Sequence, residues 1–188
     1  LEYLKLGDRT KAIECFQTCI DVTPLMAFEF IKALKAANIE FIVAPYEADA
    51  QLAFLNLSGY ISAVLTEDSD LISFGCTKVL YKLRPDGYCI EILKESLGNI
   101  KEMRFWSSER FRQMCILSGC DYLNSIPGIG VKTAMKYLEK TDAYSLMKSW
   151  KTWGSTIKAP KMPPNYLESF LLADQTFQFQ RVYDPKRG

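Results

Sequence analysis

Residues 40–65 constrain the fold most, because they predict two buried strands joined by a single helix. Residues 40–44 form a short apolar run, and residues 61–65 form a second one. Between them, residues 47–57 carry apolar side chains at helical spacing. A strand, a helix and a strand joined this closely make a right-handed βαβ unit with two parallel strands.

A hairpin and a series of helices account for most of the other residues. Residues 78–83 and 88–92 flank Arg84-Pro85-Asp86-Gly87, a turn sequence that predicts two further strands. Helical periods are found at residues 1–19 with a break at Gly7-Asp8, after Pro24, and at residues 109–117, 131–138, 143–151 and 166–173. Residues 153–164 contain three prolines and predict a loop.

These elements predict an α/β fold with a mostly parallel twisted sheet flanked by helices, followed by a helical C-terminal region. We expect an acidic α/β core over residues 1–104 and the helical region over residues 105–188. A chain of 188 residues can bury roughly 70% of its unfolded surface, so this fold needs no disulfide or zinc support.

The chain contains no histidine, which excludes several kinds of active site. Ser-His and Cys-His nucleophile pairs, HExxH zinc sites and histidine general bases all need this residue. Any chemistry must therefore rest on carboxylates, lysines or bound metal. The six cysteines include no CxxC pair, so we expect buried free thiols, a reducing intracellular compartment and no zinc cluster.

The formal net charge of +1 is the sum of two regions of opposite charge. Residues 1–100 hold 9 Lys and Arg against 14 Asp and Glu, whereas residues 101–161 hold 11 against 5. An acidic region suits a divalent cation and a basic region suits a polyanion. Metal-dependent nucleic-acid chemistry is one explanation of this asymmetry, and ordinary solvated surfaces are the other. No stretch approaches the ~20 apolar residues of a membrane span, so we expect no membrane association.

Two acidic pairs follow the two strands predicted in residues 40–65. Glu47 and Asp49 come after the first strand, and Asp68 and Asp70 come after the second. Open α/β sheets bind ligands at this edge, and four crowded carboxylates would favour bound Mg²⁺ or Mn²⁺. The structural alternatives are helix-dipole complementarity for the first pair and turn or capping roles for the second. A fifth acid, Asp121, follows an apolar helix, where it is equally explained as a turn residue.

A glycine-containing loop between two predicted helices has the features of a phosphate site. Its sequence, residues 126–134, is Ile-Pro-Gly-Ile-Gly-Val-Lys-Thr-Ala. The glycines allow close backbone approach, and the following helix begins with free N–H groups. Lys132, Lys136 and Lys140 recur every four residues beside that helix start. The loop therefore predicts sequence-independent contact with DNA phosphates, and a purely structural helical turn with a solvated Lys face is the alternative.

The chain contains three ordered motifs: Val43-Ala44-Pro45-Tyr46-Glu47-Ala48-Asp49-Ala50-Gln51, Thr66-Glu67-Asp68-Ser69-Asp70-Leu71 and Leu117-Ser118-Gly119-Cys120-Asp121-Tyr122. Together with the glycine loop and its two flanking helices, a helix-hairpin-helix, these motifs resemble the internal nuclease region of the flap-endonuclease (XPG-type) superfamily. Residues 74–76 and the sequence Phe177-Gln178-Phe179-Gln180-Arg181-Val182 are most similar to the eukaryotic exonuclease branch. The resemblance covers nearly the whole chain and implies a PIN-like 5′ nuclease fold.

The resemblance also implies an activity and its ligands. It implies a nuclear, Mg²⁺-dependent 5′ DNA exonuclease or flap endonuclease of DNA repair that uses two metal ions, with Mn²⁺ as a substitute. The metal-binding and catalytic residues would be Glu47, Asp49, Asp68, Asp70 and Asp121. Duplex DNA would bind at Gly128, Ile129, Gly130, Lys132, Thr133 and Lys136. A potassium ion would be held around Ser118, Ser125 and Ile129.

The resemblance further implies a monomer that acts on duplex DNA with 5′ ends, nicks or flaps, together with mismatch-repair proteins. The family has an N-terminal region with two more metal-binding aspartates, a helical arch with a catalytic Lys and Arg, and a wedge. None of that region lies in this chain, which begins with Leu1, so we expect a catalytically incomplete fragment. Two rival functions remain, a non-catalytic DNA-binding module and a Mg²⁺-dependent phosphohydrolase of small substrates.

Overall fold

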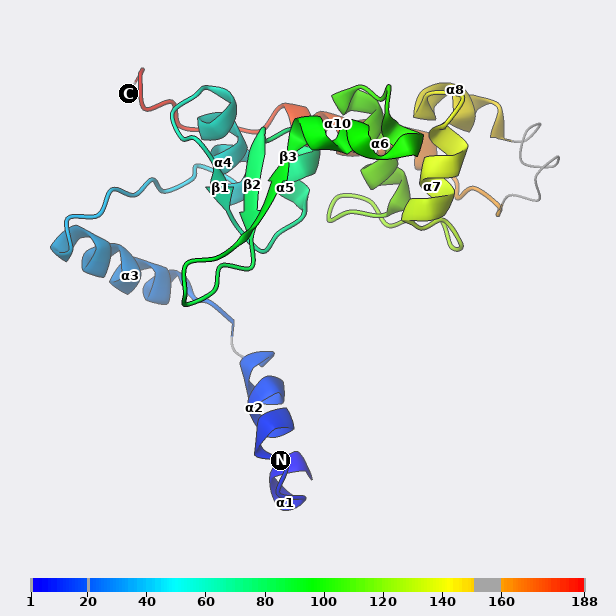
Figure 1. Ribbon diagram of the computed structural model, residues 1–188. Helices are drawn as coiled ribbons and strands as arrows, with labels where there is room; N and C mark the ends of the chain where they lie inside the picture. The colour runs from blue at the N-terminus through cyan, green and yellow to red at the C-terminus, as the bar shows by residue number, and fades with distance from the viewer. Residues whose placement is uncertain (1, 20, 151–159, 188) are drawn as a thin grey trace. The chain divides into compact units, whose positions relative to one another are not determined.

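The computed structural model describes residues 2–19, 21–150 and 160–187 (Figure 1). The chain divides into two compact units, Leu1–Val43 and Ala44–Gly188. Among the described residues, no helix has the length and apolar character needed to cross a bilayer.

The first unit consists of three helices, α1 (Glu2–Lys5), α2 (Arg9–Gln17) and α3 (Pro24–Ala36). The predicted break is confirmed at Gly7, whose φ of 78° is in the left-handed region that glycine tolerates. Asp8 begins α2 by accepting a hydrogen bond from the Lys11 amide, and Thr23 caps α3 in the same way. Ala12 is buried, whereas α3 buries none of its residues.

The second unit contains a three-stranded sheet (Figure 1). Strand β1 (Val64–Leu65) pairs in parallel with β2 (Lys78–Tyr81), which pairs in antiparallel with β3 (Ile90–Leu93). The predicted hairpin is confirmed. The prediction of a strand at residues 40–44 is wrong, and the sheet is mixed instead of mostly parallel. An apolar run predicts extended backbone, but a strand also needs a hydrogen-bonded neighbour that the run does not specify.

Helices surround this sheet and continue into the C-terminal part of the unit. They are α4 (Ala48–Leu57), α5 (Asp70–Ser73), α6 (Ser108–Ser118), α7 (Val131–Leu138), α8 (Ala143–Lys148) and α10 (Tyr166–Gln178), with 3₁₀ turns η1 (Lys94–Asn99) and η2 (Lys101–Met103). The sequence did not predict α5, η1 or η2, and α10 extends five residues beyond its predicted end. The predicted loop at residues 153–164 lies mostly outside the described residues.

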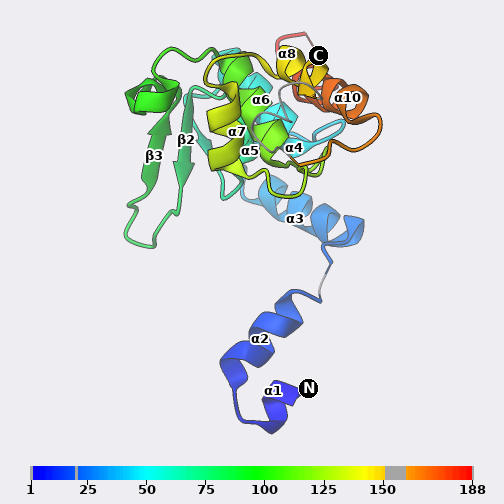
Figure 2. The same ribbon diagram turned by 90° about the vertical axis from the view of Figure 1, so that its right-hand side faces the viewer.

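Two apolar clusters form the core of the second unit. The smaller one lies between the sheet and helices α4 and α5 and includes Val64, Leu71 and Val79. The larger one joins α6, α7, α8 and α10, which lie together in Figure 2. An ion pair with a 2.7 Å separation between Arg112 Nε and Asp174 Oδ1 also ties α6 to α10. This packing fixes the ends of α4, α5 and α6, where the candidate carboxylates are found.

The cysteines are free thiols, as expected, but they are not all buried. Cys15, Cys19 and Cys89 are exposed, so the burial prediction is wrong for these three. Burial raises the pKa of the Cys76 and Cys115 thiols to about 11. Both therefore stay protonated near neutral pH and are unsuited to act as nucleophiles.

Candidate metal and nucleic-acid site

Three short segments of the second unit carry the candidate carboxylates. Glu47 is the N-cap residue of α4, and Asp49 lies in the first turn of that helix. Strand β1 leads into the loop that holds Asp68, and Asp70 begins α5. Asp121 lies three residues after the end of α6, where Gly119 turns the chain with a φ of 102°. Glu47 and Asp49 therefore also lie where the helix-dipole alternative expects them, at the N-terminus of a helix.

These carboxylates act on one another electrostatically. Burial, followed by the charges of Asp68, Glu47 and Asp121, raises the pKa of Asp49. Burial is also the largest effect on Asp70, and the charges of all four other acids add to it and raise its pKa to about 6. The structure therefore brings the five predicted carboxylates into one electrostatic neighbourhood, although they come from three separate segments.

Not every acid in this region contributes in the same way. The Asp68 Oδ1 accepts a hydrogen bond of 2.9 Å from the Asp70 amide, so the turn role weighed for this residue is real. Glu67 accepts a hydrogen bond of 2.8 Å from the Lys82 amide, which ties the loop to the residue after β2. Glu67 does not appear among the charges that raise the pKa of Asp49 or Asp70.

Two polar side chains meet on the carboxylate of Glu47. The Tyr122 hydroxyl donates a hydrogen bond to Glu47 Oε2, and Gln180 Nε2 donates to the same oxygen at 2.6 Å. Gln180 Nε2 also lies 2.9 Å from the Tyr122 oxygen. Burial and the bond to Glu47 raise the pKa of Tyr122, so its hydroxyl stays protonated and able to donate.

The donor set fits a hard divalent cation, although the described residues contain no group of three or more His, Cys, Asp or Glu close enough to hold a metal ion. All five carboxylates offer oxygen ligands, which Mg²⁺ and Mn²⁺ prefer. Their mutual effect on the pKa of Asp49 and Asp70 shows accumulated negative charge that a cation would relieve. Beside Glu47, the Gln180 Oε1 atom is buried and has no hydrogen-bond donor among the described residues.

The glycine loop before α7 leaves the start of that helix accessible. Gly130 is the N-cap residue and supplies no side-chain hydrogen bond to the helix. A Cβ atom at Gly128 or Gly130 would meet nothing within 4 Å, so the surface beside the loop is open. Gly128 has a φ of 89°, which favours glycine, whereas Gly130 has a backbone conformation open to any residue. These features are those of an anion site at a helix N-terminus.

The lysines near this loop are exposed, and two of the three predicted ones lie on α7. Lys132 and Lys136 are on the helix, with Thr133 half-buried between them. Lys140 comes after the last helical residue, so the predicted helical stripe is shorter than expected. The lysine side chains are nevertheless exposed around the same helix and available to a polyanion.

The residues expected to hold potassium lie in the connection between α6 and α7. Ser118 ends α6 and donates a hydrogen bond of 2.8 Å to the Cys115 carbonyl. A Cβ atom at Gly119 would lie 3.2 Å from the Ser125 amide, so the chain folds back tightly here. Ile129 is buried and its amide donates to the Ile126 carbonyl. The structure holds this connection compactly, and its potassium role stays a prediction.

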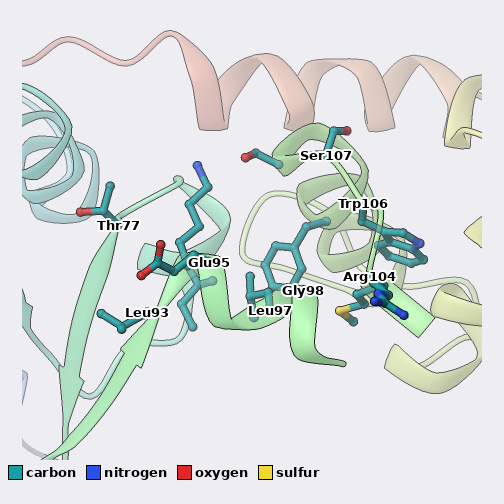
Figure 3. A pocket seen from close by; sticks show the side chains of 13 residues that line it. Thr77, Leu93, Glu95, Leu97, Gly98, Arg104, Trp106 and Ser107 are labelled. Carbon is teal, nitrogen blue, oxygen red and sulfur yellow. The ribbon is translucent and has the colours of Figure 1, made fainter. Parts of the chain in front are cut away.

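A cavity of about 620 Å³ lies elsewhere in the second unit (Figure 3). Residues from β3, η1 and the start of α6 line it, including Leu93 and Lys94, together with Trp106 from the segment before α6. None of the five candidate carboxylates is part of its lining. The carboxylate cluster is therefore not the wall of this concave pocket.

Comparisons with known proteins identify relatives of this chain. A family model described as the XPG I-region matches residues 38–121, the stretch that contains all five carboxylates. The chain is 45% identical over 188 residues to Exonuclease 1 of Danio rerio and 43% identical over 188 residues to that of Arabidopsis thaliana. These matches cover 99% and 98% of this chain.

This chain belongs to the XPG family of 5′ nucleases. It spans about a quarter of the length of these curated relatives, 23% and 25% respectively. Among XPG-type structures, the catalytic core of Rad2 with a DNA substrate matches with a TM-score of 0.70 and 20% identity, over 87% of this chain and 58% of that one. The enzyme GEN1 with product DNA and Mg²⁺ matches with a TM-score of 0.67 and 24% identity, over 88% and 45%. The fold is thus that of an XPG nuclease core.

A third structure concerns the other predicted ion. A junction-resolving enzyme GEN-1 bound to potassium matches with a TM-score of 0.67 and 20% identity, over 89% of this chain and 47% of that one. GEN1 structures with a similar fold thus contain Mg²⁺ in one case and potassium in another.

The sequence did not predict the partners of Glu47. Tyr122 directly follows Asp121 in a motif that was noted for its acid, and Gln180 belongs to the Phe177-Gln178-Phe179-Gln180 sequence, which was noted only as a resemblance. Gln180 lies between Phe179 and Arg181, and no local pattern distinguishes it from the other polar residues nearby. Its distance of 133 residues from Glu47 hides the contact from any local pattern.

Proposed function

We propose that this chain is part of a Mg²⁺-dependent 5′-to-3′ DNA exonuclease with 5′ flap endonuclease activity that acts in DNA repair. Its relation to Exonuclease 1 places it among structure-specific 5′ nucleases in general. The observation that carries the finer proposal is the electrostatic coupling of Asp49 and Asp70 with three other acids from separate segments. A surface that gathers this much negative charge suits divalent cations.

Glu47, Asp49, Asp68, Asp70 and Asp121 would hold or surround two Mg²⁺ ions, with Mn²⁺ as a substitute. When bound, such ions activate water and stabilise charge on phosphate oxygens during phosphodiester hydrolysis. The chain itself contributes rigid carriers for these oxygens, because α4, α5 and α6 are anchored in the two apolar clusters. Two further aspartates from an N-terminal region would complete the site in the whole protein.

The loop from Gly128 to Gly130 and the start of α7 would hold the duplex by its phosphates. The uncapped helix start and the exposed Lys132 and Lys136 support this assignment. A potassium ion near Ser118, Ser125 and Ile129 would bridge the connection to a DNA phosphate. The structure of GEN-1 with potassium supports the kind of ion.

The functional division of the chain follows from these two sites. Residues 1–104 would carry the acidic catalytic part, completed by Asp121, and residues 105–188 would carry the helix-hairpin-helix DNA-binding part. The substrate would be duplex DNA with a 5′ end, nick or flap, and the protein would act as a nuclear monomer together with mismatch-repair proteins. The structures of Rad2 with a DNA substrate and of GEN1 with product DNA support the substrate class.

The rival functions fit the molecule less well. A phosphohydrolase of small substrates usually holds its substrate in a concave pocket, and the cavity of about 620 Å³ has no candidate carboxylate in its lining, so this cavity is not such a site. A non-catalytic DNA-binding module would have no need to gather acids from three segments, where burial and then the charges of the other acids raise the pKa of Asp70 to about 6.

Cleavage of a 5′-labelled duplex by the complete protein tests the proposal. We expect cleavage with Mg²⁺ or Mn²⁺ and none with EDTA. Turnover of p-nitrophenyl phosphate should be at least ~100-fold slower, because the small ester lacks the contacts with the glycine loop that position DNA. Tight duplex binding without metal-dependent cleavage would favour the non-catalytic module. Faster hydrolysis of the small ester would favour the phosphohydrolase.

A further inference from the structure

The segment after α10 is locked to helix α4 by a pair of hydrogen bonds. Gln51 Nε2 donates to the Tyr183 carbonyl at 2.9 Å, and the Tyr183 amide donates to Gln51 Oε1 at 2.7 Å. Gln51 lies in α4 and is only 3% exposed. Both ends of one amide side chain thus fix the register of the C-terminal segment along the helix that begins beside Glu47.

This register places Gln180 on Glu47. Gln180 Nε2 lies within hydrogen-bond distance of both Glu47 Oε2, at 2.6 Å, and the Tyr122 oxygen, at 2.9 Å. The Tyr122 hydroxyl is then free to donate its proton to the same carboxylate oxygen. Reversing the Gln180 amide would point its oxygen at the carboxylate, so the hydrogen-bond network fixes its orientation.

The ring of Tyr122 packs against other aromatic side chains. The Tyr122 and Phe177 rings meet edge to face with centroids 4.9 Å apart, and Phe177 meets Phe74 at 4.8 Å. Phe177 is 6% exposed and lies in the last turn of α10. The hydroxyl that reaches Glu47 is therefore carried by a packed ring, and the helix that carries Phe177 also leads to Gln180.

We propose that Gln180, together with Tyr122, is a positioning residue that orients the Glu47 carboxylate for a divalent cation. Within the described chain both donors end on Oε2 and none on Oε1, which leaves Oε1 available as a ligand. Hydrogen bonds to the other oxygen of a ligating carboxylate fix its orientation and tune its affinity for the metal. The inference rests on the proposed function and extends it to the C-terminal segment.

Two substitutions in the complete nuclease test this role. Gln180→Leu keeps the side-chain size and removes both donors, and Tyr122→Phe keeps the packed ring and removes the hydroxyl. Gln178→Leu is the matched control, because Gln178 is exposed and, among the described residues, its side chain bonds only to Asp174 of the same helix. The first readout is Mn²⁺ affinity from the spin-resonance signal of free Mn²⁺, which needs no turnover.

We expect each variant to weaken Mn²⁺ binding roughly tenfold and to raise the Mg²⁺ concentration for half-maximal cleavage by a similar factor. The KM for duplex DNA should stay within about twofold of the parent value, because the glycine loop before α7 is unchanged. The thermal midpoint in EDTA should match that of Gln178→Leu. In a Glu47→Gln background, Gln180→Leu should add no further loss of Mn²⁺ affinity, because its effect passes through Glu47.

Mn²⁺ affinity within twofold of the parent for both variants would overturn the positioning role, provided that Glu47→Gln itself weakens Mn²⁺ binding. A lowered thermal midpoint with unchanged Mn²⁺ affinity would also overturn it and leave a purely structural role. If Gln180→Leu does not fold, Tyr122→Phe decides the question alone. Unchanged Mn²⁺ binding and cleavage in Glu47→Gln would instead refute the ligand set of the proposed function.

Discussion

The carboxylate cluster and the glycine loop are built in opposite ways. In the cluster, side chains from three segments bring like charges together, and burial, followed by these charges, raises the pKa of Asp49 and Asp70. In the loop, backbone groups at the start of α7 lack a side-chain cap, and lysines surround them. One region has an excess of acceptors and the other an excess of donors. This difference supports the proposal that cations bind at the first region and phosphate binds at the second.

The largest expected effect is a loss of cleavage without a loss of duplex binding when the carboxylate cluster alone is changed. In the complete protein, Asp70→Asn should reduce cleavage at least ~100-fold, because it removes a metal ligand, while duplex binding stays equal or improves as repulsion of phosphate falls. Cleavage rates and affinities of parent and variant decide this. Asp86→Asn, on the exposed hairpin turn, is the matched control, and cleavage by Asp70→Asn within tenfold of the parent would contradict the assignment.

Duplex affinity across a salt series tests the loop by itself. Lys132→Ala should weaken binding to unrelated duplexes by similar factors, roughly tenfold at 0.1 M salt, and lower the log–log salt slope by about 0.9 for one lost phosphate contact. An unchanged salt slope for Lys132→Ala would indicate that the loop is only a structural connection between two helices.

A glycine variant distinguishes backbone approach from charge in the same loop. Gly130→Val should fold normally, because its backbone conformation is open to any residue and its Cβ would meet nothing within 4 Å. Binding should nevertheless fall even at low salt, since the side chain keeps phosphate away from the helix start. Circular dichroism checks the fold first, and a folded variant that binds like the parent would count against phosphate contact here.

The cost of crowding the acids can be measured without DNA. The pKa of Asp70, about 6 against an ordinary 3.8, means that the folded state holds this proton more tightly. Stability should therefore fall as the pH rises from about 4 to about 6. In EDTA at pH 7.5, Asp70→Asn should be more stable by about 1 kcal/mol after allowance for solvent screening. Denaturant midpoints should converge below pH 4, and Mg²⁺ should stabilise the parent more than the variant.

An acid outside both regions sets the baseline for a purely structural carboxylate. Asp142 caps α8 by accepting from the Ser145 amide at 2.9 Å, which lowers its pKa. Its stabilising effect is present above its ordinary pKa and is lost as the pH falls. Asp142→Ala should cost about 1 kcal/mol near pH 7, less at low pH, and leave cleavage unchanged. Loss of cleavage in a stably folded Asp142→Ala would contradict a purely structural role for this acid.

The sequence determined the local elements, because their signals are local. Spacing and breakers located α4, α6 and α7 to within a residue or two, and the turn at Arg84-Pro85-Asp86-Gly87 placed the hairpin. The acids and the glycine loop were likewise visible as short motifs. The sequence could not specify which strand would find a partner, so residues 40–44 were wrongly expected to pair.

Only the tertiary structure decided which polar groups act together. Glu67 and Asp68 are neighbours in the sequence, yet Glu67 ties the loop to Lys82 while Asp68 adds its charge to that of Asp70. Gln180 reaches Glu47 across 133 residues because α10 packs on α6 and Gln51 fixes the register of the following segment. Sequence patterns follow the chain, whereas hydrogen bonds and charges depend on distance in space, and the packed core alone sets that distance.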